Sequence, residues 1–271
     1  MRDIFTGAAE PLTKMAFDDA NDTLRSSTDD AAAIPVQAAS LWAVLKVETR
    51  GFGYLPDKRP QILFERHIFN RRTRGVFDAG YPDLSNTEAG GYSGGAAEYT
   101  RLARAMQLDR KAAYESASWG LGQIMGFNAT LLGYESAEDM VESFKAGEDA
   151  QLDATVRFIT GNASLLGAFR SRNWARFAFF YNGKNYSKNR YDEKLAQYQS
   201  EYMHELPDIG IRAAQARLTY LGYFRKGIDG IWGDDTKEAV NQFQKANGLK
   251  VSDTLDTDTT KKLEGLESYA S

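Results

Sequence analysis

Apolar residues recur at the spacing of an α-helix through most of this chain, and that periodicity limits the possible folds more than any other feature. It is clearest over residues 102–108, 141–159 and 174–181. Gly, Pro and aromatic residues interrupt it between residues 51 and 95, where residues 61–65 have the composition of one short strand. The sequence therefore predicts a mainly α fold with a small β-element.

A domain boundary is indicated by the Pro-Asp-Ile-Gly segment that follows a polar helix expected over residues 191–205. We expect a first domain over residues 1–205, a linker over 206–210 and a second domain over 211–271. The chain is long enough for one medium domain and one small one. The second domain is expected to form three short helices and to fold alone.

The composition excludes several kinds of catalytic site. The chain has no cysteine, which rules out thiol nucleophiles and thiolate metal sites. Its two histidines, His67 and His204, lie too far apart in the sequence to match the short ligand spacings of zinc sites. Neither a phosphate-binding loop nor a Gly-x-Ser-x-Gly motif occurs. Carboxylates are therefore the expected catalytic groups, with no metal and no cofactor.

The net charge and the hydropathy of the chain indicate which partners and which cellular compartment to expect. The net charge is −4, and no basic face indicates a nucleic-acid partner. No apolar run approaches the roughly 20 residues that a membrane helix needs, and the N-terminus lacks the apolar segment of a secretory signal. We expect a protein that is kept in the cytoplasm where it is made and does not insert stably into a membrane.

Glu48 is the sharpest candidate for a catalytic group. Leu41, Leu45 and Glu48 are spaced i, i+4 and i+7, so the carboxyl shares the apolar face of a helix that Gly51 ends. Burial and the negative end of the helix dipole would both raise its pKa, and a carboxyl that is protonated at neutral pH can act as a general acid. Taken alone, the same pattern also fits a surface Glu in the last turn of a helix.

Two further motifs add context to Glu48. Residues 118–128, Ser-Trp-Gly-Leu-Gly-Gln-Ile-Met-Gly-Phe-Asn, place three glycines around Gln123, which gives a backbone that a ligand can approach closely and an amide that can bind it. Residues 178–183, Ala-Phe-Phe-Tyr-Asn-Gly, end an apolar helix with the pair Tyr181 and Asn182. Either motif alone is typical of helix packing and capping.

Glu65 has two interpretations. It ends the expected strand and could be the second carboxylate of a glycosidase pair, or it could form an ion pair with Arg66 or a neighbouring arginine. His67 is interpreted as a structural, hydrogen-bonding histidine.

Three motifs follow one another in the sequence: Glu48 at a helix end, residues 118–128, and the pair Tyr181 and Asn182. In this order they resemble the motifs of the lysozyme-like superfamily, and more closely those of the N-acetylmuramidase family of phage endolysins. The matching segments are residues 47–51, 59–67, 90–92, 98–102 and 118–128. The resemblance spans roughly residues 30 to 200 and implies a lysozyme-like fold, with Glu48 in the catalytic position. It departs from the family at Gly122, where Phe is common. Substrate contacts are implied for Ser118, Gly120, Gln123, Asn128, Tyr181 and Asn182.

The last 61 residues resemble the type 1 peptidoglycan-binding domain. They contain a weak internal repeat, in which residues 229–236 and 253–260 each form a turn that leads into a helix. Thr254 and Thr257 stand where the second turn of that family normally carries glycines. The resemblance implies wall-binding roles for Asp229, Gly230, Trp232, Gly233, Phe243 and Gln244.

The resemblance implies hydrolysis of the β-1,4 bond between N-acetylmuramic acid and N-acetylglucosamine in peptidoglycan, by an endolysin that lyses its host. One alternative is a lytic transglycosylase, in which the 6-hydroxyl of muramic acid replaces water. A second is a non-catalytic wall-binding virion protein. The expected partner is peptidoglycan, and the expected state is a monomer that waits in the host cytoplasm and needs a pore-forming holin to reach the wall.

Overall fold

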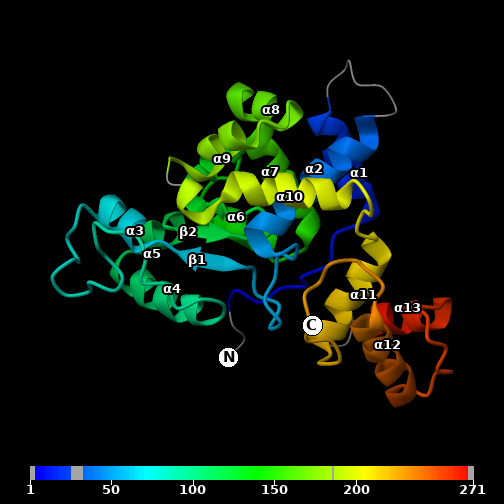
Figure 1. Cartoon of the computed structure of the whole chain (residues 1–271). Helices are drawn as coiled ribbons and strands as arrows, with labels where there is room; N and C mark the ends of the chain where they lie inside the picture. Colours follow the sequence, from blue (N-terminus) through cyan, green and yellow to red (C-terminus); the bar gives the residue numbers. More distant parts are fainter. Residues whose placement is uncertain (1–3, 26–32, 185, 268–271) are drawn as a thin grey trace.

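The computed structural model describes residues 4–25, 33–184 and 186–267, and helices make up most of it (Figure 1). The helices of the first part are α1 (Lys14–Leu24), α2 (Ala33–Thr49), α3 (Arg66–Thr73), α4 (Ala97–Leu108), α5 (Arg110–Glu115), α6 (Ala137–Phe144), α7 (Glu148–Thr160), α8 (Ala163–Arg170), α9 (Trp174–Asn182) and α10 (Tyr191–Tyr202). Short 3-10 helices are η1 (Gly126–Asn128), η2 (Thr130–Leu132) and η3 (Tyr186–Asn189). The mainly α prediction is confirmed. No helix within the described ranges is long and apolar enough to cross a membrane.

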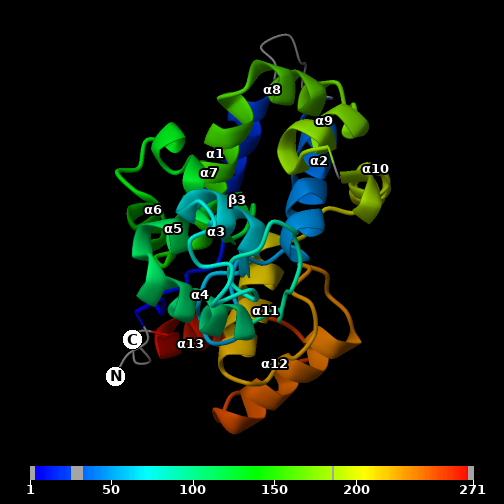
Figure 2. The same ribbon diagram turned by 90° about the vertical axis from the view of Figure 1, so that its left-hand side faces the viewer.

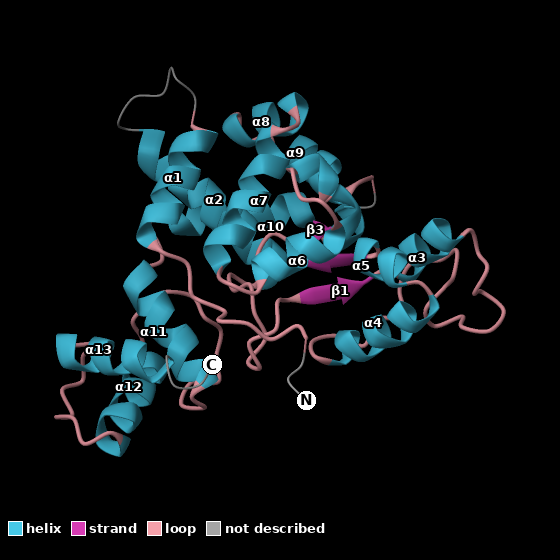
Figure 3. Cartoon of the chain, turned by 180° about the vertical axis from the view of Figure 1, so that it is seen from behind, coloured by secondary structure: helices cyan, strands magenta, loops and turns pink. Residues whose placement is uncertain are grey.

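A small antiparallel sheet supplies the β-element (Figure 3). Its strands, in pairing order, are β1 (Ile62–Phe64), β2 (Ala117–Trp119) and β3 (Ile124–Met125). Leu63 lies opposite Ser118 in the first pair, and Ser118 lies opposite Met125 in the second. The strand expected over residues 61–65 is present but shorter by one residue at each end. Its partner strands were not expected, because the glycine-rich Ser118 motif shows no strand-like alternation.

Two apolar cores hold this first part together. One surrounds the sheet and includes the fully buried rings of Phe64, Phe69 and Trp119. The other, which includes Trp42 and Leu45, lies among α1, α2 and helices α7 to α10. Helix α10 packs along α2 (Figures 1 and 2). The second core therefore fixes α2, the helix that carries Glu48.

Three C-terminal helices gather at one end of the molecule, as expected (Figures 1 and 2). They are α11 (Ile209–Tyr220), α12 (Asp234–Ala246) and α13 (Thr257–Glu267). Helix α11 begins at Ile209 because the Asp208 carboxylate caps it, accepting a hydrogen bond from the N–H of Ile211 at 2.8 Å. The helix therefore starts within the segment that we expected to be a linker, and α10 ends at Tyr202, three residues earlier than expected.

The C-terminal helices share their apolar core with the first part of the chain. Phe52 and Tyr54 are 6% and 2% exposed and belong to the same buried cluster as Leu218, Val240 and Phe243. The hydroxyl of Tyr54 also donates to the carbonyl of Phe144 at 2.6 Å, so this ring is anchored on both sides. The two parts are packed into one body, and the core of the second part is completed by side chains of the first.

Candidate active site

Glu48 lies in the last turn of α2 (Ala33–Thr49), at the position that its spacing predicts. Leu41 and Leu45, on the same face of the helix, are fully buried. The helix ends where Arg50 and Gly51 take left-handed φ angles of 61° and 93°, and the N–H of Gly51 donates to the carbonyl of Leu45 at 3.2 Å. Glu48 is therefore held at the end of a helix whose residues 37–45 are all buried.

Burial dominates the electrostatics of the Glu48 carboxyl. Loss of hydration raises its pKa from 4.5 to about 7. The side-chain amide of Asn182, at the end of α9, donates to Glu48 Oε1 at 3.2 Å and opposes part of that rise. A substantial fraction of the carboxyl thus keeps its proton at neutral pH, as a general acid must.

The side-chain oxygen of Asn182 can accept a further hydrogen bond. This Oδ1 atom is buried and accepts no hydrogen bond from any residue that the structure describes. An amide can donate to a carboxylate through its nitrogen and can accept from a protonated carboxyl through its oxygen. Asn182 can therefore pair with Glu48 before and after the carboxyl gives up its proton.

Two tyrosines complete the surroundings of Glu48. The hydroxyl of Tyr181 donates to the carbonyl of Gly122 at 2.7 Å, which ties α9 to the β2–β3 hairpin. Burial, followed by the charge of Glu48, raises the pKa of Tyr181. Burial also raises the pKa of Tyr191, with contributions from Glu48 and from Glu65. Sequence reasoning missed Tyr191, because nothing local separates it from the other tyrosines of the chain.

The Ser118 motif forms the β2–β3 hairpin, and its polar side chains bind one another. Ser118 Oγ donates to Gln123 Oε1 at 2.9 Å, and Gln123 Nε2 donates to the carbonyl of Gly120 at 3.0 Å. These three predicted substrate contacts therefore lie together in one tight turn. Asn128 lies beyond them at the end of η1.

The glycines of this hairpin serve packing against α7. A Cβ at Gly120 would come within 2.8 Å of the Gln151 side chain, and one at Gly122 within 2.1 Å of Thr155 Oγ1. The close approach that we assigned to a ligand is made by the protein's own helix. Because Gly120 and Gly122 have no side chains, the hairpin can lie directly against α7.

Glu65 is held by a tyrosine and lies beside a histidine. The hydroxyl of Tyr92 lies 3.0 Å from both oxygens of Glu65, and Nδ1 of His67 lies 3.1 Å from Oε2. Arg66 binds the backbone carbonyl of Glu88 at 2.9 Å instead, so the ion pair considered from the sequence does not form with this arginine. In the described ranges, no three His, Cys, Asp or Glu side chains are grouped to hold a metal ion.

Comparison with known proteins identifies the family. Residues 37–203 match the N-acetylmuramidase family, over more than half of the chain. The chain belongs to the N-acetylmuramidase family. A similar solved structure is the crystal structure of Burkholderia AP3 phage endolysin, with 42% identity, a TM-score of 0.60 and coverage of 75% of this chain and 73% of that one. No curated protein matches.

The family match confirms the resemblance of the first part, and it makes this muramidase a peptidoglycan-hydrolysing glycosidase. Residues 208–263 match a peptidoglycan-binding domain family, which confirms the resemblance of the second part. The first matched segment lies in the part of the fold that contains the sheet, and the second covers the C-terminal helices.

The peptidoglycan-binding part of the muramidase contains two turns that are held in the same way. Gln215 accepts from the N–H groups of Asp229 and Gly230 at 3.0 and 2.8 Å. Gln244 accepts from the N–H of Ser252 at 3.1 Å and donates to Thr259 Oγ1 at 2.9 Å. One buried glutamine thus supports each turn of the internal repeat.

Some of the residues proposed for wall binding are buried and others are accessible to solvent. Phe243 and Gln244 are fully buried, so they support the domain from inside and cannot contact the wall. Gly230 has a φ of 71°, and a Cβ there would lie 2.9 Å from the carbonyl of Asp208. Trp232 is half-buried and Gly233 is exposed, so their wall-binding roles stay predictions.

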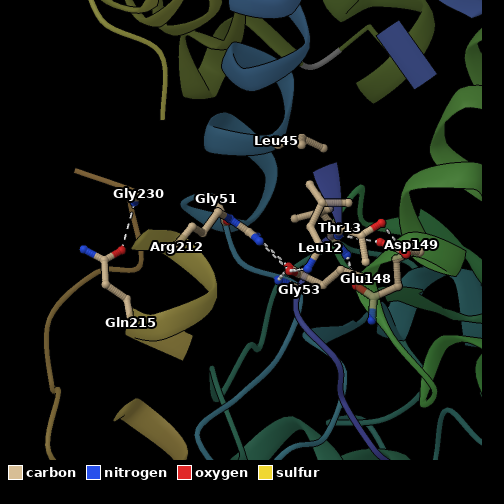
Figure 4. A network of polar contacts seen from close by, with 12 residues as sticks. Leu12, Thr13, Leu45, Gly51, Gly53, Glu148, Asp149, Arg212, Gln215 and Gly230 are labelled. Carbon is tan, nitrogen blue, oxygen red and sulfur yellow. Dashed lines mark hydrogen bonds and ion pairs between the residues drawn. The ribbon is translucent and has the colours of Figure 1, made fainter. Parts of the chain in front are cut away.

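A buried ion pair joins the peptidoglycan-binding part to the muramidase part (Figure 4). Arg212 of α11 and Glu148 of α7 are 1% and 0% exposed, with guanidinium nitrogens 2.5 and 2.6 Å from the two carboxylate oxygens. Arg212 also donates to the carbonyl of Gly51, just past the end of α2. Glu148 in turn accepts from the N–H groups of Leu12 and Gly53 at 2.9 and 2.8 Å. We call this set the interdomain network.

Proposed function

We propose that this muramidase is an endolysin that hydrolyses the β-1,4 bond between N-acetylmuramic acid and N-acetylglucosamine, with Glu48 as its general acid. The observation that carries the proposal is the half-buried Glu48 carboxyl, which lies at the end of α2 beside the Asn182 amide and whose pKa is raised by loss of hydration to about 7. The similarity to a phage endolysin supports a role in host lysis.

In the proposed reaction, Glu48 gives its proton to the glycosidic oxygen as the bond to C1 of muramic acid breaks. The sugar then carries positive charge shared between C1 and its ring oxygen, and a water molecule adds to C1. The Nδ2 atom of Asn182 stabilises the Glu48 carboxylate left behind. Gln123 and Tyr181 position the sugars, Gln123 from the turn of the hairpin and Tyr181 by holding that hairpin beside Glu48.

Glu65 is our candidate for the second catalytic carboxylate, which takes a proton from the attacking water. Burial is the main cause of the raised pKa of Tyr191, and the charges of Glu48 and Glu65 both add to it. Tyr92 would hold the Glu65 carboxylate in place. Ser118 and Asn128 remain proposed substrate contacts, whereas the close approach at Gly120 is taken up by Gln151 of α7.

The wider biology follows from the family and stays a proposal. The protein would act as a monomer, wait in the host cytoplasm and reach the wall through a pore made by a holin. The peptidoglycan-binding part would keep it on its substrate, with Asp229, Trp232 and Gly233 as the candidates for contact.

Mass analysis of the fragments released from purified sacculi tests the reaction type. Hydrolysis leaves a free reducing muramic acid, because water supplies the atoms that complete C1. A transglycosylase would leave a 1,6-anhydro end that is lighter by one water. We expect reducing ends to predominate, and a predominance of anhydro ends would assign the enzyme to the transglycosylases.

A further inference from the structure

A cavity of about 350 Å³ lies between the muramidase part and the peptidoglycan-binding part. The first part supplies Thr49, Arg50 and Gln61 to its lining, and the second part supplies Arg225, Lys226 and Ile228. Neither part forms this cavity without the other. It begins at the residue that follows Glu48 in the chain.

The charges on this lining have one sign. Three of the lining residues are cationic and none is acidic. Arg50 and Arg225 are exposed and form no ion pair with any residue in the described ranges, and Lys226 lies 3.6 Å from Asp235 in a loose, exposed pair. The lining therefore offers two unpaired guanidinium groups, which bind carboxylates well because they can donate two parallel hydrogen bonds.

The backbone at Arg50 brings the chain from the end of α2 into the lining of the cavity. Arg50 has a φ of 61°, a conformation that glycine adopts more readily than arginine, and Gly51 follows it with a φ of 93°. This conformation ends α2 and leads the chain into Phe52 and Tyr54, which also line the cavity.

The interdomain network fixes both walls. Arg212 binds the carbonyl of Gly51, between the lining residues Arg50 and Phe52. One turn further along α11, Gln215 binds the N–H of Gly230 and so anchors the loop that carries Arg225 (Figure 4). Because one helix holds both walls, a ligand would meet a site that is already formed, with little ordering cost.

We propose that this cavity binds the carboxylates of the peptide stems of peptidoglycan and forms a stem subsite of the muramidase. The inference rests on the proposed function. Each stem is attached to the lactyl group of a muramic acid, the sugar whose bond is cut, so it must pass close to Glu48. Arg50 is two residues from Glu48, which is about 7 Å of extended chain at most.

The test compares two substrates on the full-length protein. Soluble glycan strands from sacculi are divided, and an N-acetylmuramoyl-L-alanine amidase removes the stems from one half. The measured quantity is kcat/KM for the release of reducing ends, expressed as the ratio of stem-bearing to stripped strands. In Arg50→Gln/Arg225→Gln we expect this ratio to fall about tenfold at low salt, and less at high salt.

A matched control removes two other positive charges from exposed positions outside the cavity, as Lys250→Gln/Lys262→Gln, and should keep the ratio of the wild type. An unchanged ratio in the arginine variant would overturn the stem subsite, and this includes an equal loss on both substrates, as a general attraction to wall polyanions would give. If the wild type cut neither substrate, the proposed function itself would fail.

Discussion

Replacement of Glu48 by Gln is expected to abolish wall lysis and leave the fold intact. Gln keeps the shape of the side chain but has no proton to transfer to the glycosidic oxygen. General acid catalysis contributes roughly 10² to 10⁴-fold, so the rate of clearing of a sacculus suspension should fall by at least about a hundredfold. The assay is turbidity, with thermal unfolding measured on the same sample.

Glu88→Gln, an exposed change of the same kind, is the matched control and should clear the suspension at the wild-type rate. Activity of Glu48→Gln within about tenfold of wild type would exclude Glu48 as the general acid, given that contribution. In the same assay, near wild-type activity of Glu65→Gln would remove Glu65 from the mechanism and leave it as the partner of Tyr92.

Replacement of Arg212 by Ala is expected to destabilise the whole protein. It leaves the Glu148 carboxylate buried and without its cation, and removal of one partner from a buried pair typically costs about 3 to 5 kcal/mol. Two N–H donors would remain on Glu148, which is not enough to replace the guanidinium. Urea unfolding monitored by tryptophan fluorescence measures the change in free energy.

The control is Arg190→Ala, which breaks an exposed pair with Glu193 and should leave the free energy of unfolding close to that of the wild type. A loss for Arg212→Ala as small as that of the control would show that the interdomain network contributes little. A chain cut after residue 206 should be destabilised too, because it lacks Arg212 and uncovers Phe52 and Tyr54. The structure thus argues against the independent modules that the sequence suggested.

The Glu48 site could be predicted because its information is local. The spacing of Leu41, Leu45 and Glu48 and the helix stop at Gly51 lie within 11 consecutive residues. The C-terminal helices were predictable for the same reason, since each is preceded by its own turn in the sequence. Local patterns of this kind depend little on the rest of the fold.

The remaining features depend on contacts between distant parts of the chain. The partner strands of β1 and the packing of Gly120 on α7 follow from the tertiary fold. Arg212 and Glu148 are 64 positions apart, and a charged residue in a short helix is ordinarily expected to be exposed. Tyr191 is part of the site only because α10 packs along α2.

The central claim is that burial holds the Glu48 carboxyl in its protonated form near neutral pH. Titration of its side-chain carboxyl carbon by ¹³C NMR measures this directly, with the signal assigned by its absence in Glu48→Gln. Because burial disfavours the charged form, the midpoint should lie at about 7, and kcat/KM should fall as the pH rises through that value. A midpoint near the ordinary glutamate value of 4.5 would contradict the account.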